Sequence, residues 1–241
     1  MIFKKKPIVA FPPKDFYRLD HKMYVATDCI ILGYDSNNLK LLLFQRNLEP
    51  FKGEWSLIGT FVHLDESLEE ASERVLEQTT GLTNIFMEQT FTYGGLKRDP
   101  GYRCVSIVRY ALIRLDEHDT KLAKEYHAKW FSLDELPNMI LDHQQMINDA
   151  LEILREKAKK QSIGFELLPK KFTLPQFRRL YESIYQKEID PRNFRKKVLS
   201  LDILTKLEEK DKSNSKKGAF LYTFNALKYG KNFASKAGLD F

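Results

Sequence analysis

Several carboxylates lie close together in one short stretch of this 241-residue chain, and their spacing could allow them to bind a metal ion. Glu70, Glu73 and Glu77 stand at positions i, i+3 and i+7, so a helix through them would carry all three on one face. Carboxylates gathered on one face can hold Mg²⁺, and the alternative is a solvated face with no ligand. The histidines and cysteines show no zinc spacing, so we expect no structural zinc.

The same stretch resembles the Nudix box, the signature of a family of diphosphate hydrolases. The family pattern is Gly, five residues, Glu, seven residues, Arg-Glu, an aliphatic residue, one residue, Glu-Glu, one residue, Gly and an aliphatic residue. Aligned without gaps, the chain matches this pattern at Glu66, Arg74, Leu76, Gly81 and Leu82. Thr60 takes the place of the first glycine, and the three glutamates that follow the arginine are replaced by Val75, Gln78 and Thr79.

In the Nudix family that the stretch resembles, these three glutamates hold Mg²⁺ against a diphosphate. This chain lacks all three. Neutral side chains bind a hard cation weakly, so metal-assisted hydrolysis is not expected. In this alignment the Glu70 face turns away from the pocket, and Glu66 and Arg74 form a structural ion pair between loop and helix. We predict no catalytic residue, no metal, no cofactor and no enzymatic activity. The alternative is a Nudix pyrophosphohydrolase with unconventional ligands and a basic accessory domain.

Residues 91–106 resemble the matching stretch of ADP-ribose-type Nudix proteins and of the Nudix-related transcriptional regulators (NrtR-like proteins), and Asp142 and His143 fit the same group. The resemblance implies a homodimer that binds a palindromic operator and releases it when the Nudix-like domain binds a metabolite. Loss of the metal cage favours a sugar such as L-arabinose as effector, as in the branch that controls carbohydrate metabolism, with an ADP-ribose-like nucleotide next. The candidate effector-binding residues are Arg46, Trp55, Phe61, Glu66, Arg98 and Arg103.

Apolar patterns predict the elements that must position these residues. Residues 23–46 indicate two strands joined by a turn at 35–38, the simplest form of which is a hairpin. Residues 66–78 have the composition of a helix, with Ser67 near its start and Gly81 just past its end. Further strands are predicted over 86–93 and 102–114, and a helix over 143–159.

Positive charge is concentrated at the C-terminal end. Residues 1–154 hold 18 Lys and Arg against 23 Asp and Glu, whereas residues 155–241 hold 21 against 10. A basic module joined to an acidic one is the charge pattern of a nucleic-acid-binding domain carried by another domain. The alternative is a solvated basic segment without a partner.

Two helices joined by a short turn are predicted in this basic part. Thr173 can cap a helix over 172–185, and Asp190 can cap a second over 191–199 whose Phe194, Val198 and Leu199 are expected to face inward. With strands at 201–207 and 218–224, the pattern resembles the winged helix of the same regulators. Arginine and asparagine can bind base edges and lysine binds phosphates. The predicted DNA-binding residues are Arg192, Asn193, Arg195, Lys196, Lys197, Lys216 and Lys217.

Together these patterns predict a two-domain chain of the α+β or α/β class. Residues 1–160 are expected to form a Nudix α/β/α sandwich with a mixed sheet and a core of about 20–158, and residues 161–241 a winged helix-turn-helix. No signal sequence or membrane span is recognisable, and Cys29 and Cys104 are expected to be free buried thiols, so we predict a cytoplasmic protein. The predicted function is sequence-specific repression on double-stranded DNA. A further alternative is an RNA-binding or scaffold protein.

Overall fold

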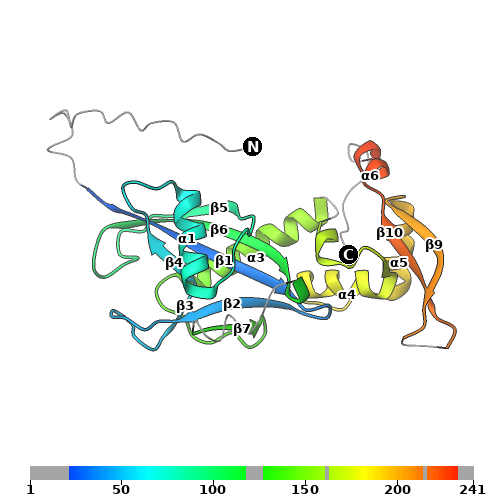
Figure 1. Ribbon diagram of the computed structural model, residues 1–241, viewed down its shortest axis with the longest axis horizontal. Helices are drawn as coiled ribbons and strands as arrows, with labels where there is room; N and C mark the ends of the chain where they lie inside the picture. Colours follow the sequence, from blue (N-terminus) through cyan, green and yellow to red (C-terminus); the bar gives the residue numbers. More distant parts are fainter. Residues whose placement is uncertain (1–21, 118–126, 161–162, 214–215, 233–241) are drawn as a thin grey trace.

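Two sheets organise the residues that the structure describes, which are 22–117, 127–160, 163–213 and 216–232 of the computed structural model (Figure 1). The larger sheet has seven strands in the order β3-β2-β1-β6-β5, with β4 paired to β1 and β7 paired to β2. Its strands are β1 (Tyr24–Tyr34), β2 (Leu39–Gln45), β3 (Trp55–Ser56), β4 (Ile58–Phe61), β5 (Glu88–Tyr93), β6 (Cys104–Arg114) and β7 (Ala128–Ser132). The long central strands β1 and β6 run parallel and the other pairs are antiparallel, so the sheet is mixed as predicted.

Two helices cover the opposite faces of this sheet, α1 (Leu68–Thr80) on one and α3 (His143–Lys160) on the other (Figure 1). Successive side chains of a strand point to opposite faces, and β1 follows this rule. Its Cys29 and Ile31 pack in the cluster that contains Val75 of α1. Ile30 and Leu32 pack in the cluster that contains the buried face of α3. The sandwich therefore follows from the apolar run Cys29–Leu32 of its central strand, whose successive side chains pack on opposite faces.

The predicted local elements of this part are confirmed. β1 and β2 form the hairpin expected over 23–46. Ser67 caps α1 in a capping box with Glu70, and Gly81 ends the helix in the left-handed conformation. A 3₁₀ turn, η2 (Leu115–Glu117), follows β6. Both cysteines are buried and free.

The smaller unit is a winged helix. It contains η3 (Phe165–Leu167), β8 (Phe172–Thr173), α4 (Leu174–Tyr185), α5 (Pro191–Ser200), β9 (Leu204–Asp211), β10 (Ala219–Phe224) and α6 (Ala226–Asn232). Its sheet has the order β8-β10-β9, and β9 and β10 form the predicted wing. Phe177 of α4, fully buried, packs edge-on against Phe194 of α5 with 5.4 Å between ring centres.

One buried residue of the recognition helix was assigned wrongly from the sequence. Phe194 and Val198 face inward as predicted, but Leu199 is 41% exposed. Residues 194 and 198 are four apart and share a helix face, whereas position 199 lies a further 100° or so around the helix. The inward face of α5 is therefore narrower than the sequence suggested.

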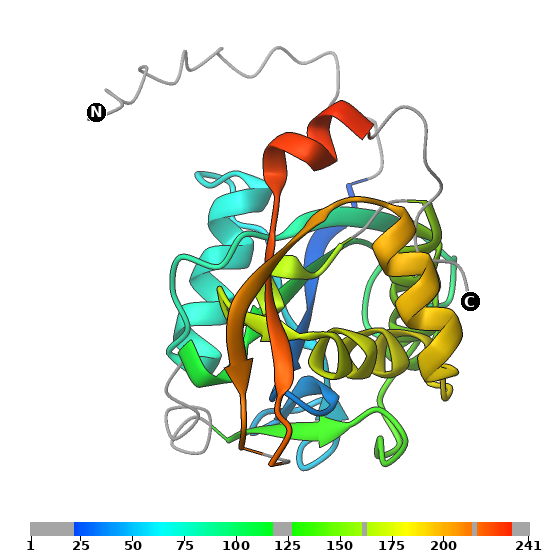
Figure 2. The same ribbon diagram turned by 90° about the vertical axis from the view of Figure 1, so that its right-hand side faces the viewer.

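The two units share one apolar core. A single cluster of buried side chains includes Ile30 and Leu43 of the large sheet, Leu151 of α3 and Leu180 of α4. The end of the β1–β2 hairpin also bonds to α4: the Leu39 backbone N–H donates to Ser183 Oγ at 2.6 Å, and Arg179 donates to Asn37 Oδ1 at 3.1 Å. Figure 2, which looks onto the winged helix, shows α4 lying across the end of the sandwich. None of the described helices combines the length and apolar character needed to cross a bilayer.

Candidate functional site

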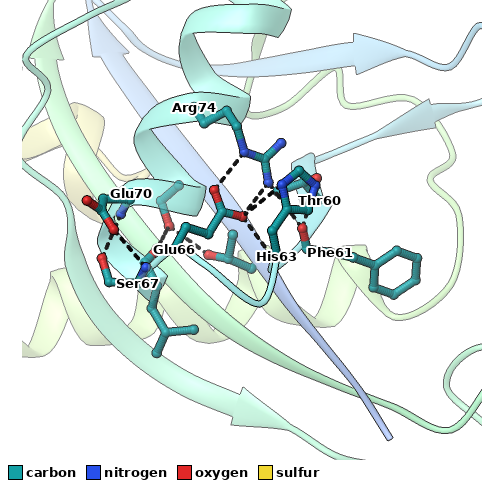
Figure 3. Close-up of polar contacts among 10 residues, drawn as sticks. Thr60, Phe61, His63, Glu66, Ser67, Glu70 and Arg74 are labelled. Carbon is teal, nitrogen blue, oxygen red and sulfur yellow. Dashed lines mark hydrogen bonds and ion pairs between the residues drawn. The ribbon is translucent and has the colours of Figure 1, made fainter. Parts of the chain in front are cut away.

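The loop before α1 is held to the helix by an ion pair (Figure 3). Arg74 donates from Nε to Glu66 Oε2 at 2.8 Å and from Nη2 to Oε1 at 2.6 Å. The backbone N–H of His63 donates to the same carboxylate at 2.8 Å, and Arg74 also reaches the carbonyl of Phe61 at 3.2 Å. These donors, Arg74 first, lower the pKa of Glu66 from 4.5 to about 2. The predicted structural role of the Glu66–Arg74 pair is confirmed.

The glutamate positions of the Nudix box present no carboxylate. Val75 is 7% exposed and belongs to the apolar core against the sheet. Gln78 is exposed, and the Thr79 hydroxyl donates to the carbonyl of Val75 within α1. Glu70, Glu73 and Glu77 are all exposed, and Glu70 accepts from the Ser67 N–H at the start of α1. Within the described ranges no three His, Cys, Asp or Glu side chains gather as a metal site would require.

A cavity of about 140 Å³ lies beside the N-terminal half of β1. Its walls come from β1, the end of β2, the β3–β4 segment, Thr79 of α1, the 98–104 loop and residues 140–143 at the start of α3. Among the lining residues are Asp28, Arg46, Phe61, Arg98 and His143. The cavity therefore brings together three of the predicted effector-binding residues, Arg46, Phe61 and Arg98.

The other three candidates lie outside this lining. Glu66 is occupied by Arg74. Arg103 donates to the backbone carbonyls of Gly95 and Cys104 at 3.2 and 3.3 Å, and the Trp55 ring packs edge-on against Phe131 at 4.8 Å. Glu66 and Arg103 thus bind other residues of the protein, and Trp55 packs against a neighbouring ring.

Arg98 is already held by carboxylates. Its Nε and Nη2 atoms each donate to Asp142 at 2.9 Å, and Nη2 lies 3.8 Å from Asp28 Oδ2. Its side chain is only 5% exposed. A guanidinium in this state anchors the 98–104 loop to the start of α3, and a phosphate would have to compete with Asp142 for it. Arg46 donates through Nε to the Pro50 carbonyl at 2.9 Å.

Asp28 and His143 form the buried polar part of the cavity wall, and sequence analysis did not single out Asp28. Its Oδ2 atom accepts from the Ser106 hydroxyl at 2.5 Å, and Oδ1 lies 3.8 Å from His143 Nε2. The Leu57 backbone N–H donates to His143 Nδ1 at 3.0 Å. Burial lowers the pKa of His143. A charged residue directly before the apolar run Cys29–Leu32 of a predicted strand was the available signal for Asp28.

The other candidate surface is α5. Residues Arg192, Asn193, Arg195 and Lys196 are exposed, and Lys197 is partly exposed. Asp190 caps the helix by accepting from the Asn193 N–H at 2.8 Å. Before it, Glu182 accepts from Arg178 at 2.8 Å and from the Ile189 N–H at 3.0 Å, which fixes the turn between α4 and α5. The chain thus presents the polar face of α5 on a rigid turn.

The wing adds a second basic surface. Lys216 and Lys217 are exposed just before β10. Lys206 and Lys210 of β9 lie over the Phe220 ring, with Nζ 3.7 and 4.4 Å from its centre. Two lysines of the wing, Lys206 and Lys210, therefore lie beside an aromatic side chain.

Comparison with known proteins matches both parts of this fold. Residues 23–150 match the NUDIX domain and residues 164–224 the NrtR DNA-binding winged helix domain. The "ADPR responsive transcriptional repressor NtrR" of Acinetobacter baylyi is 30% identical over 87% of this chain and 85% of its own length. An ADP-ribose pyrophosphatase of Methanocaldococcus jannaschii is 37% identical over 55% of this chain and 76% of its own.

A solved structure extends the match to both domains at once. The crystal structure of Shewanella oneidensis NrtR complexed with a 27mer DNA has 30% sequence identity and a TM-score of 0.71, covering 89% of this chain and 97% of that one. The chain therefore belongs to the NrtR family, in which a Nudix domain is followed by a winged helix.

Proposed function

We propose that this protein is a transcriptional repressor that binds a palindromic operator as a homodimer and releases it when its Nudix domain binds an ADP-ribose-like nucleotide. The observation that carries the proposal is the solvent-facing side of α5, on which arginine, asparagine and lysine side chains follow a capped helix N-terminus. The N-terminal half of such a helix is the part that reads base edges in a major groove. The relative bound to DNA has the same two domains.

An ADP-ribose-like effector is preferred to a free sugar. Two relatives are named for ADP-ribose, one as a responsive repressor and one as a pyrophosphatase. Arg46 lines the cavity and can meet a phosphate through the guanidinium nitrogens that do not bind Pro50. The sugar preference drawn from the sequence has no support among these relatives, and L-arabinose becomes the second candidate.

The test is fluorescence anisotropy on promoter DNA from the neighbouring genes and on scrambled DNA, with and without ADP-ribose or L-arabinose. Arg195→Ala should lose about 1–3 kcal/mol on the cognate site and relax sequence preference if Arg195 contacts a base. Lys217→Ala should lower the slope of log affinity against log salt by about 1 on both DNAs, because it removes a phosphate contact. Lys52→Ala, an exposed lysine of the other domain, is the control.

Equal affinity of the wild type for cognate and scrambled DNA would overturn the proposal. So would an Arg195→Ala variant that behaves as the wild type on both sites. Light scattering of the protein–DNA complex tests the dimer, and one chain per operator would remove the palindrome from the proposal.

We also propose that the Nudix domain is not a hydrolase, because valine, glutamine and threonine stand where the family signature has metal-binding glutamates. The pyrophosphatase relative makes hydrolysis the competing function. Incubation with ADP-ribose and Mg²⁺ should release no AMP. Rapid release that is abolished by Glu66→Gln would establish an enzyme instead.

A further inference from the structure

We propose that Asp28 and His143 bind one hydroxyl group of a pentose ring, as acceptor and donor respectively, and thereby select the terminal ribose of the effector. This inference rests on the proposed effector role of the Nudix cavity. It assigns a specificity role to two buried residues, of which Asp28 also lies 3.8 Å from Arg98 through its other carboxylate oxygen, Oδ2.

His143 is fixed as a hydrogen-bond donor. Its Nδ1 atom accepts from the Leu57 N–H at 3.0 Å, so in the neutral ring the proton is on Nε2. The side chain is 6% exposed, and burial favours the neutral form. Nε2–H therefore stands as a single, oriented donor in the wall of the cavity.

Asp28 supplies the matching acceptor. Ser106 donates to Oδ2, which leaves Oδ1 with no hydrogen bond from any residue in the described part of the chain. Oδ1 lies 3.8 Å from His143 Nε2, which is too long for a direct bond. An oxygen about 2.8 Å from both atoms could accept from Nε2–H and donate to Oδ1. A hydroxyl group does both, whereas a phosphate oxygen cannot donate and meets the Asp28 charge.

The size of the cavity decides which part of a nucleotide can reach this pair. At about 140 Å³ it is smaller than the roughly 300 Å³ at which pockets begin to enclose a drug-sized ligand. Only one end of ADP-ribose can enter. Those ends are the adenine ring, which has no hydroxyl group, and the terminal ribose, which has several, so the terminal ribose is the end that can place a hydroxyl between Asp28 and His143. The ring of Phe61, which lines the cavity, lies 5.0 Å from that of Tyr24, which lies 4.9 Å from that of Tyr102, and all three rings are exposed. These rings can pack against the part of the ligand that stays outside.

The experiment is calorimetric titration of the full-length protein with ADP-ribose, ADP and L-arabinose. His143→Asn keeps an acceptor near the Nδ1 position for Leu57 but removes the Nε2–H donor. His127→Asn is the control, since His127 is exposed and its positive φ of 59° suits asparagine. Thermal unfolding of each variant is measured alongside, and Asp28→Asn serves as the second variant.

We expect His143→Asn to bind ADP-ribose about tenfold more weakly, the loss that goes with one hydrogen bond in a buried site, and ADP unchanged. His127→Asn should match the wild type with both ligands. Equal weakening for ADP and ADP-ribose would assign His143 a merely structural role and overturn the inference, as would no change with ADP-ribose.

Other results would refute the proposed function rather than the hydroxyl inference. If the wild type binds L-arabinose and not ADP-ribose, the nucleotide effector is wrong. The hydroxyl inference then stands only if His143→Asn weakens L-arabinose about tenfold. If the wild type binds neither ligand, both the effector role and the hydroxyl inference fall.

Discussion

Gly59 leaves room for the carboxylate of Asp28, and a single methyl group should close that room. β1 and β4 pair with Asp28 opposite Gly59. A Cβ atom on Gly59 would lie 2.1 Å from Asp28 Oδ1, and since real Cβ contacts stay above 3.0 Å the carboxylate must move by about 0.9 Å. Gly59→Ala therefore perturbs the cavity wall without touching α1 or the winged helix.

The cost can be worked out from two contributions. Overpacking a tight interior costs about 1–3 kcal/mol. Moving Asp28 also weakens the hydrogen bond from Ser106, now 2.5 Å long, and bonds to charged groups are worth about 1.5–3 kcal/mol. Because the two contributions describe one displacement and do not simply add, we expect about 3 kcal/mol of lost stability.

Urea unfolding measures this loss as a lower midpoint at unchanged slope. Gly95→Ala is the matched control, because its Cβ would meet nothing closer than the Arg98 Cβ at 3.8 Å, an ordinary contact. Effector affinity should fall in Gly59→Ala and stay in Gly95→Ala. If the two variants differ by less than about 0.5 kcal/mol, the close approach of Asp28 to Gly59 does not exist in solution and the reasoning fails.

Two more predictions concern the loop and the junction between the units. Glu66→Gln should be less stable than wild type at neutral pH. Because the folded-state pKa of Glu66 is lowered from 4.5 to about 2, that difference should shrink as pH falls from 5 toward 2 in acid unfolding. Ser183→Ala should cost about 1–3 kcal/mol in urea unfolding, because the buried Leu39 N–H loses its acceptor. A Ser183→Ala midpoint equal to wild type would mean that water or another group replaces the hydroxyl.

The parts of the fold that sequence predicted are those that depend on neighbours along the chain. Ser67, Gly81, Thr173 and Asp190 each cap the helix expected of them. Capping needs only residues within one turn, so the signal is local. The gapless register of the Nudix box likewise placed Glu66 and Arg74 together eight residues apart.

The candidate site was harder because its partners come from distant strands. Ser106 stands 78 residues after Asp28, and His143 stands 86 residues after Leu57. Arg98 was expected to be open to a ligand, yet Asp142 holds it from 44 residues away. The parallel pairing of β1 and β6 brings Asp28 beside Ser106. A pattern of neighbouring residues in the sequence does not predict that pairing. Leu199 was wrongly predicted to be buried because the inward face of α5 is narrower than the sequence pattern suggested.

The apolar core that runs without a break from the large sheet through α3 to α4 also limits how such a regulator can be recombined. A module that carries its own closed core can be exchanged between proteins at a linker, but here the inner side of α4 is covered by side chains of the other unit. Grafting this winged helix onto another sensor would expose that surface to water. The transferable piece is therefore larger than the winged helix, and includes the apolar side of α3 and the end of the β1–β2 hairpin.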